Sequence, residues 1–297
     1  RRDPPDILLT TPESLTLLLS YPDADRIFGH LRYVVTDELH AMAGTKRGDQ
    51  LALGLSRLAT LAPGHRRIGL SATVAEPDKL EGYLGSDGAV SRVIGRGGVK
   101  PDIRVLLSGE RVPWSGHSAK HAFGELYEII RTVDTALVFV NTRSQAELVF
   151  QELWRLNDDG MAIALHHGSL AVENRRKVEA AMSRGGLRAV VCTSTLDLGV
   201  DWGSVDLVIQ VGAPKGISRM LQRIGRSNHR MDEPSRALLV PANRFELLEC
   251  RAALEAIGEG ILDGAPREKG GLDVLAQHIL ATAASGPFQP EALYDEV

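Results

Sequence analysis

The sequence predicts an α/β protein whose parallel sheets are covered by helices. Short apolar, β-branched runs alternate with longer amphipathic stretches, which is the pattern of this class. Acidic or hydroxyl-bearing residues follow several of these runs, at the strand ends where ligands of such sheets bind. A breaker-rich stretch at Gly95, Gly97, Gly98 and Pro101 divides the chain, and we expect a domain boundary there. A length of 297 residues is enough for two domains.

The predicted strands are spread over most of the chain, with helical patterns between them. In chain order they are Ile7–Thr10, Tyr33–Thr36, Arg67–Leu70, Ala136–Val140, Ile163–Leu165, Ala189–Cys192, Leu207–Val211 and Ala237–Val240. Leucines recur at or near helical spacing in two of the intervening segments, at Leu51, Leu55 and Leu58 and at Leu148, Leu153 and Leu156. The pattern turns helical after about Asn243, and Gly270–Gly271 precedes one more helix.

The composition is that of an ordinary globular protein, with 43% hydrophobic and 24% charged residues. A net charge of −4 does not favour nucleic-acid binding, so any basic surface must be local. Cys192 and Cys250 lack metal-ligand spacing, which fits a reducing compartment such as the cytoplasm and excludes a disulfide framework. His117 and His121 lack the Glu that a zinc-protease helix carries. No apolar run reaches the ~20 residues that cross a membrane, so we expect no membrane partner.

Asp37 and Glu38 directly follow the predicted strand Tyr33–Thr36. Two adjacent carboxylates at the end of an apolar strand are costly unless a cation lies beside them. Magnesium binds carboxylate and phosphate oxygens together, and the second acid can then polarise a water for attack on a phosphoryl group. The alternative is a solvated turn. The pair therefore predicts a magnesium–nucleotide site, provided that other strand ends carry matching chemistry.

Hydroxyl side chains follow two further predicted strands. Ser71 and Thr73 come after Arg67–Leu70, and Thr193 begins the segment TSTLDLGVD after Ala189–Cys192. These hydroxyls can contact phosphates, and Gly199 allows a close approach of the backbone.

The segment Lys215–Arg230 contains five basic residues and no acid. If it is helical, one face carries Arg219, Arg223, Arg226 and Arg230, and another carries Met220, Leu221 and Ile224 toward the core. A solvated basic face is the ordinary alternative. Such faces normally mix charges of both signs, so this one predicts an anionic partner.

Six motifs in order resemble motifs Ib to VI of superfamily-two helicases: TTPESL, DELH, SAT, VFVNTRSQAE, CTSTLDLGVD and QRIGRSNHR. The longer stretches ILLTTPESLTLLLSYPDA, GTKRGD, HHGSL and DLVIQVGAPKGISRMLQRIGRSNHR resemble the large helicase-related (Lhr) family. Within it they are most similar to the bacterial ligase-associated DExH-box branch. The resemblance covers nearly the whole chain and is specific, because the motifs agree in order and spacing.

The resemblance implies two RecA-like parallel-sheet domains, the first truncated at its N-terminus. Residues 1–99 would be the later part of the first domain, 100–245 the second, and 246–297 a helical linker with the start of a winged helix. The cofactors would be ATP and Mg²⁺. Asp37 would hold the metal and Glu38 would activate the attacking water.

The resemblance also implies roles for further residues. His40 would report the nucleotide state to the second domain through Gln222, and Ser71 and Thr73 would couple hydrolysis to the grip on nucleic acid. Gly199 and Asp201 would touch the nucleotide, and Arg223 and Arg226 would reach the γ-phosphate, one of them as an arginine finger. The residues expected to follow the sugar–phosphate backbone are Thr11, Pro12, Glu13, Asn141, Thr142, Arg143, Gly168, Ser169 and Thr193. Hydroxyls and amides at such positions also cap helices, which is the alternative for this set.

Two features depart from the family pattern. Position 228 is Asn where relatives often have Gly, and the phosphate-binding motif GxxxxGK[ST] does not occur in the sequence. The chain begins RRDPPDILL without Met and stops at YDEV, so we expect a segment of a longer protein with that loop upstream. The segment alone is expected to be inactive as an ATPase.

The resemblance implies an ATP-dependent DNA helicase that moves 3′ to 5′ on a single strand, acts in DNA repair and resides at the bacterial nucleoid. Its nucleic-acid partner would be single-stranded DNA or a duplex with a loading strand, an RNA–DNA hybrid included. A DNA ligase or nuclease partner is implied by the branch name alone. One alternative is an RNA helicase, although Gln222 and the sequence DELH favour DNA. The other is a non-catalytic nucleic-acid-binding fragment.

Overall fold

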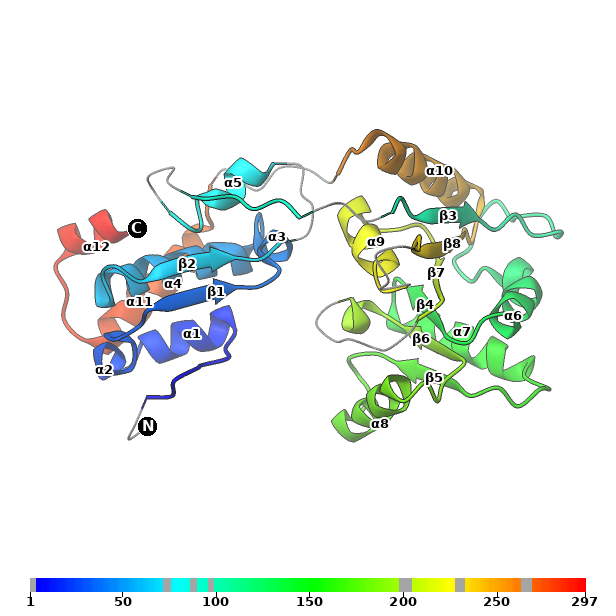
Figure 1. Cartoon of the computed structure of the whole chain (residues 1–297), viewed down its shortest axis with the longest axis horizontal. Helices are drawn as coiled ribbons and strands as arrows, with labels where there is room; N and C mark the ends of the chain where they lie inside the picture. The colour runs from blue at the N-terminus through cyan, green and yellow to red at the C-terminus, as the bar shows by residue number, and fades with distance from the viewer. Residues whose placement is uncertain are drawn as a thin grey trace. The chain divides into compact units, whose positions relative to one another are not determined.

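The computed structural model describes residues 4–71, 76–85, 90–95, 99–197, 205–227, 233–262 and 269–297. The chain forms two compact units (Figure 1). The first contains Arg1–Val93 together with Gly264–Val297, and the second contains Ile94–Asp263. Residues 246–297, expected to form one C-terminal region, are therefore divided between the units. The winged-helix assignment within them stays a prediction.

The first unit contains a parallel pair of strands, β1 (Tyr33–Thr36) and β2 (Arg66–Gly69). Its helices are α1 (Pro12–Leu19), α2 (Ala24–Phe28), α3 (Leu39–Met42), α4 (Lys46–Leu61), α5 (Pro77–Glu81), α11 (Leu272–Ser285) and α12 (Pro290–Glu296). The leucines that predicted α4 are buried in one core with residues of α1, α2 and α3. α11 packs on α1 and α4. An ion pair of 2.5 Å joins Lys46 Nζ to Asp273 Oδ2.

The predicted strand Ile7–Thr10 is wrong, because these residues form no strand. Ile7 is 81% exposed and Leu9 is 92% exposed. A strand requires a neighbour that completes its hydrogen bonds, and within the described residues the first sheet contains β1 and β2 alone.

The second unit is built on a six-stranded parallel sheet in the order β3-β8-β7-β4-β6-β5. The strands are β3 (Asp102–Val105), β4 (Ala136–Val140), β5 (Ile163–His166), β6 (Ala189–Cys192), β7 (Leu207–Val211) and β8 (Arg236–Val240). The sequence missed β3 because Asp102 and Arg104 interrupt its apolar pattern. An edge strand can carry such charges, since one of its sides is unpaired.

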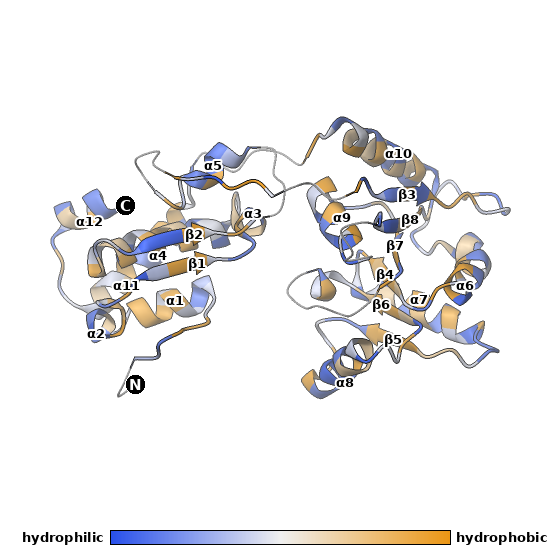
Figure 2. Ribbon diagram, viewed as in Figure 1, coloured by the Kyte–Doolittle hydropathy of each residue, from blue (hydrophilic) through white to orange (hydrophobic). Residues whose placement is uncertain are grey.

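Helices cover both faces of this sheet. They are α6 (Phe123–Arg131), α7 (Arg143–Arg155), α8 (Val172–Ser183), α9 (Ile217–Ile224) and α10 (Arg244–Glu259), with short 3₁₀ turns η1 (Lys120–Ala122) and η2 (Ser194–Leu196). α6 and α7 share one apolar core with the sheet, and α8, α9 and α10 share another. β4, β6 and β7 are consequently buried along their whole length, and α9 carries both hydrophobic and hydrophilic residues (Figure 2). None of the helices that the structure describes could span a bilayer.

Candidate functional site

The acid pair lies at the carboxyl end of β1, where the backbone turns sharply. Glu38 has φ 51° and ψ 40°, a left-handed conformation that is uncommon outside glycine. α3 begins at the next residue. Asp37 is exposed, and its Oδ1 accepts a hydrogen bond of 2.9 Å from the Glu38 backbone N–H. Strained residues of this kind concentrate at functional sites.

His40 connects this turn to the loop after β2. Its Nε2 lies 3.3 Å from Glu38 Oε2, and its Nδ1 lies 3.0 Å from Ser71 Oγ. Burial lowers the pKa of the imidazole below its ordinary value of 6.5, although the carboxylates of Glu38 and Asp37 act in the opposite direction. A neutral ring with the proton on Nε2 donates to Glu38 and accepts from Ser71, so this tautomer satisfies both contacts.

The sequence assigned separate roles to Glu38, His40 and Ser71 but did not predict their contact. The signal was available in principle, because neighbouring parallel strands bring their following residues together. Two backbone hydrogen bonds fix the same loops, from Leu70 N to Thr36 O at 2.9 Å and from Leu39 N to Leu70 O at 3.0 Å.

The carboxylates fit a magnesium ion that a nucleotide holds in large part. Magnesium commonly takes one or two protein carboxylates and completes its shell with phosphate and water oxygens. Asp37 offers an exposed carboxylate for this purpose. No cluster of three or more His, Cys, Asp or Glu side chains among the described residues could hold a metal by itself.

In the second unit, three arginines converge on Asp197. Arg223 forms a two-pronged pair with its carboxylate, Nε to Oδ1 at 2.7 Å and Nη2 to Oδ2 at 3.2 Å. Arg226 Nη2 donates to the Asp197 carbonyl at 2.7 Å, and Arg219 Nε lies 3.6 Å from Oδ2. Asp197 is therefore an anionic partner of these arginines within the protein, and the sequence did not identify it. The anionic ligand that the basic segment predicted stays a prediction.

The long basic helix expected over residues 215–230 is wrong in extent. α9 ends at Ile224, so Arg226 follows the helix and does not extend its face. Met220 and Ile224 are buried as predicted. Arg230 lies outside the described residues.

The Arg223 side chain is buried in this structure, and its expected contact with the γ-phosphate stays a prediction. It is 5% exposed, and its Nη1 donates to Gln210 Oε1 at 2.5 Å. The guanidinium lies over the Phe139 ring at 4.6 Å from the centroid. Nε, Nη1 and Nη2 thus all bond inside the second unit.

Several residues expected to contact nucleic acid cap helices in this structure. Thr11 Oγ1 accepts from Ser14 N at 3.3 Å and Pro12 opens α1, which fits the capping alternative. Thr142 Oγ1 likewise accepts from Gln145 N at 3.2 Å at the start of α7. As donors, Thr11 Oγ1 lies 3.3 Å from Ser14 Oγ and Thr142 Oγ1 lies 3.4 Å from Gln145 Oε1, so both hydroxyls bond within the first turns of their helices.

Other members of the set form exposed polar pairs. Glu13 accepts two hydrogen bonds from Arg47, at 2.6 and 3.3 Å, and chiefly these lower the pKa of Glu13 to about 2. Arg143 Nη1 donates to Ser169 Oγ at 3.1 Å, and the Arg143 side chain is 62% exposed. Gly168 precedes Ser169, so the loop after β5 and the start of α7 meet at this pair.

Asn141 and Thr193 bond within the second unit. Asn141 Nδ2 donates to the Ala213 carbonyl at 2.8 Å, which ties the end of β4 to the end of β7. Thr193 N donates to the His166 carbonyl at 3.3 Å. The Asn141 amide bonds inside the second unit, and its expected contact with the sugar–phosphate backbone stays a prediction.

His166 is a buried residue that bonds to the segment after β6, which contains Thr193 and Thr195. It is 1% exposed, with Nδ1 at 2.8 Å from Thr195 Oγ1 and Nε2 at 3.1 Å from Glu179 Oε1. Burial lowers the pKa of this imidazole. The sequence did not single it out.

Three predicted site residues, Thr73, Gly199 and Asp201, lie outside the described residues, as does Asn228. Gln222 is half-buried on α9 in the second unit, whereas His40 belongs to the first. Their expected communication stays a prediction.

Family comparisons agree with this arrangement. A DEAD/DEAH box helicase model matches residues 1–80, and a helicase conserved C-terminal domain model matches residues 121–231. The ATP-dependent helicase Lhr-Core of Methanocaldococcus jannaschii is 36% identical over 297 residues, which is 99% of this chain and 35% of that protein. The Lhr helicase/probable uracil glycosylase of Mycolicibacterium smegmatis is 34% identical over 99% of this chain and 22% of its own length.

The structural comparison gives the same result. The Mycobacterium smegmatis helicase Lhr bound to ssDNA and AMP-PNP superposes with a TM-score of 0.89 and 36% identity, over 99% of this chain and 39% of that one. This chain thus spans about a third of the Lhr-Core relatives it matches, 35% in the first case. Two units with RecA-like parallel sheets, the ordered motifs and these similarities together show that the chain belongs to the Lhr family of superfamily-two helicases.

Proposed function

We propose that the protein is an ATP-dependent helicase that translocates along single-stranded DNA. The observation that carries the proposal is the contact of His40 with both Glu38 and Ser71 beside Asp37. Relatives named ATP-dependent helicases, and an Lhr bound to ssDNA and AMP-PNP, support it. The proposal includes 3′-to-5′ movement, a role in DNA repair at the nucleoid, and the ligase or nuclease partner implied by resemblance to the ligase-associated branch.

In the first unit, Asp37 and Glu38 divide the chemistry of hydrolysis. Asp37 would hold the magnesium ion of bound ATP, which neutralises the charge that develops on the phosphates. Glu38 accepts a proton from the attacking water as the bond from the γ-phosphorus to ADP breaks. His40 Nε2 donates to Glu38 Oε2, and this contact would orient the carboxylate for the attacking water.

In the second unit, Arg226 is the arginine finger of the proposal and Arg223 positions it. Arg223 is held by two charge-assisted bonds to Asp197, and replacing them would cost several kcal/mol in a buried site. Arg226 donates instead to the neutral backbone carbonyl of Asp197. A hydrogen bond to a neutral acceptor is weaker than one to a carboxylate, so Arg226 can exchange it for a phosphate oxygen at a lower cost in free energy.

The nucleic-acid grip is assigned to the exposed pair Arg143 and Ser169 together with Thr193. Arg143 supplies a positive charge, and the two hydroxyls can donate to phosphate oxygens. Binding should therefore weaken steeply with salt, as phosphate contacts do. Unwinding of duplexes whose tracking strand is DNA or RNA decides between the proposal and an RNA helicase, because RNA tracking would reverse our assignment.

The decisive experiment is Glu38→Gln in the protein that the natural reading frame encodes. Glutamine keeps the shape of the side chain but cannot take the proton, so hydrolysis should fall by ~10²-fold or more while ATP still binds. The matched control is Glu291→Gln, the same substitution at an exposed position in the first turn of α12. ATPase activity within a few-fold of the parent in Glu38→Gln would refute the assigned role.

Residues 1–297 alone should not turn over ATP, because their sequence has no glycine-rich loop and lysine to hold the phosphates. Magnesium-dependent, DNA-stimulated ATPase should appear in a longer chain that also contains such a loop and lysine. Robust activity of residues 1–297 would mean that the chain holds phosphates by another route.

A further inference from the structure

Gln210 is a polar side chain in an otherwise apolar, fully buried strand. The other residues of β7 are Leu207, Val208, Ile209 and Val211, and Gln210 itself is 3% exposed. Burial of an amide costs free energy unless its hydrogen bonds are made inside the protein. Its partners therefore indicate why this position carries glutamine.

The Gln210 amide bonds to Arg223, in the cluster of arginines around Asp197, and to Asn141, at the end of β4 near the proposed DNA contacts. Its Oε1 accepts from Arg223 Nη1 at 2.5 Å, and its Nε2 donates to Asn141 Oδ1 at 3.4 Å and to the Val211 carbonyl at 3.1 Å. Arginine has donors only, so the oxygen of the amide must face Arg223 and the nitrogen must face Asn141. The amide is thus oriented by its two neighbours.

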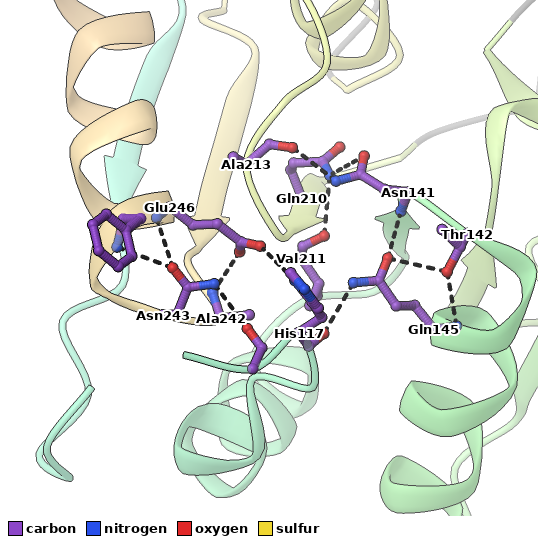
Figure 3. Close-up of polar contacts among 12 residues, drawn as sticks. His117, Asn141, Thr142, Gln145, Gln210, Val211, Ala213, Ala242, Asn243 and Glu246 are labelled. Carbon is purple, nitrogen blue, oxygen red and sulfur yellow. Dashed lines mark hydrogen bonds and ion pairs between the residues drawn. The ribbon is translucent and has the colours of Figure 1, made fainter. Parts of the chain in front are cut away.

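Figure 3 shows how the Asn141 end of this network is built. Asn141 Nδ2 reaches the Ala213 carbonyl, and the Asn141 backbone N donates to Gln145 Oε1 at 3.2 Å. Gly212 has φ +85°, and a Cβ there would lie 3.1 Å from Asn141 Nδ2. The absence of a side chain at Gly212 therefore leaves space for the Asn141 amide, which extends from the end of β4 to the Ala213 carbonyl after β7.

A continuous chain of bonds follows from these contacts. It runs from Asn141 through Gln210 and Arg223 to Asp197, whose carbonyl accepts from Arg226. Asn141 lies two residues before Arg143, the proposed phosphate contact for DNA. Arg226 is the proposed finger for ATP. Gln210 is the link that both ends share.

We infer that Gln210 is a positioning residue that couples DNA binding to the arrangement of the arginines, an inference that rests on the proposed function. When the Asn141 loop responds to DNA, the bond to Gln210 transmits a shift to Arg223 and so to Asp197 and Arg226. Contiguous hydrogen-bond networks with two arrangements can carry such coupling. Gln210 contacts neither ligand.

The test compares Gln210→Leu and Gln210→Glu with Gln145→Leu in the natural protein. Leucine removes all three hydrogen bonds of the Gln210 amide, to Arg223, Asn141 and the Val211 carbonyl. Glutamate keeps an acceptor for Arg223 but loses the donor to Asn141, so it separates the two ends. Gln145→Leu is the matched control, since that amide contacts Asn141 but not Arg223.

We expect both Gln210 variants to lower the stimulation of ATPase by single-stranded DNA about 5-fold or more, the lower range of coupling between sites. DNA affinity and DNA-free hydrolysis should change less than this ratio. Gln145→Leu should keep the ratio within about 2-fold. Equal losses in all three variants would reduce Gln210 to a structural role, and an unchanged ratio in Gln210→Glu would overturn the coupling.

Hydrogen exchange of α9 with and without single-stranded DNA supplies a second readout. DNA should change the exchange of α9 in the parent but not in Gln210→Glu, even at equal occupancy. If the parent shows no DNA-stimulated ATPase, the proposed function fails while exchange still decides the role of Gln210. If Gln210→Leu does not fold, Gln210→Glu decides alone, because its side chain matches glutamine in size.

Discussion

The two sheets of this protein differ in how completely helices cover their faces. In the second unit, helices cover both faces of a six-stranded parallel sheet, and its central strands are fully buried. In the first unit, one side of β1–β2 packs on the helical core, whereas Tyr33, Val35, Ile68 and Leu70 are 42–58% exposed. Parallel sheets are normally covered on both faces.

The chemistry follows the same division. The acids of the first unit lie exposed or half-buried at a strand end, held by a turn and one histidine. The arginines of the second unit are organised by the buried carboxylate of Asp197. The comparison teaches that a strand-end site can be stabilised either by local backbone geometry or by a buried charge network, and the two should respond differently to mutation.

The largest contrast should come from Arg226→Ala and Arg223→Lys. Loss of an arginine finger can reduce hydrolysis by ~10³-fold or more, and Arg226→Ala should do so while single-stranded DNA affinity stays nearly constant. Arg223→Lys keeps the charge but cannot make the two-pronged pair with Asp197, so it should lower both thermal stability and hydrolysis. Equal loss of DNA binding in Arg226→Ala, with turnover intact, would assign the basic segment to DNA instead.

The packing difference can be tested with one substitution in each sheet. Val138 in β4 is completely buried, so Val138→Thr should destabilise the second unit by about 1–3 kcal/mol through a buried hydroxyl. Val35 in β1 is 57% exposed, so Val35→Thr should change stability by about 0.5 kcal/mol or less. Denaturant unfolding with strand-resolved hydrogen exchange measures both. A comparable cost at Val35 would mean that this face is covered in solution.

The pH dependence of the second unit should reflect His166. Burial holds its pKa below the ordinary 6.5, against the raising effect of Glu179, while Arg175 and His167 also lower it. The unfolded chain then binds more protons than the folded one below about pH 6.5, so stability is full above that pH and falls as pH decreases through it. His166→Gln should flatten this slope in urea unfolding between about pH 5 and 7. A slope unchanged by the substitution would contradict the assignment to His166.

The smallest effect is expected at the exposed pair of Glu13 and Arg47 in the first unit. The pKa of Glu13 is lowered to about 2, so its stabilisation should be present at neutral pH and lost as pH falls below about 4.5. Because both side chains are about half exposed, Glu13→Gln should cost less than ~1 kcal/mol, and less still at high salt. A larger, salt-independent cost would show that Glu13 does more than pair with Arg47.

Much of the fold followed from apolar runs, because buried parallel strands require them. β3 escaped prediction since an edge strand tolerates Asp102 and Arg104, and Ile7–Thr10 was overpredicted because apolar composition alone does not supply a neighbour. At the site, the position of Asp37 and Glu38 at the end of a strand was predictable from the apolar run before them, whereas Arg226 was expected on a helix and follows α9 instead. The pairing of Arg223 with Asp197, and the contact of His40 with Ser71, arise between distant segments, which a one-dimensional pattern does not encode.

The left-handed backbone at Glu38 has a consequence for evolution and engineering. A residue with a Cβ pays roughly 1–2 kcal/mol to adopt this conformation, whereas glycine adopts it freely. Glu38→Gly should therefore make the first unit more resistant to denaturation while removing the carboxylate that hydrolysis needs. Selection for thermal tolerance alone would drift toward loss of function here. At this turn, catalytic activity and thermal stability favour different residues. A screen for stability should therefore also select for ATPase activity, so that Glu38 is retained.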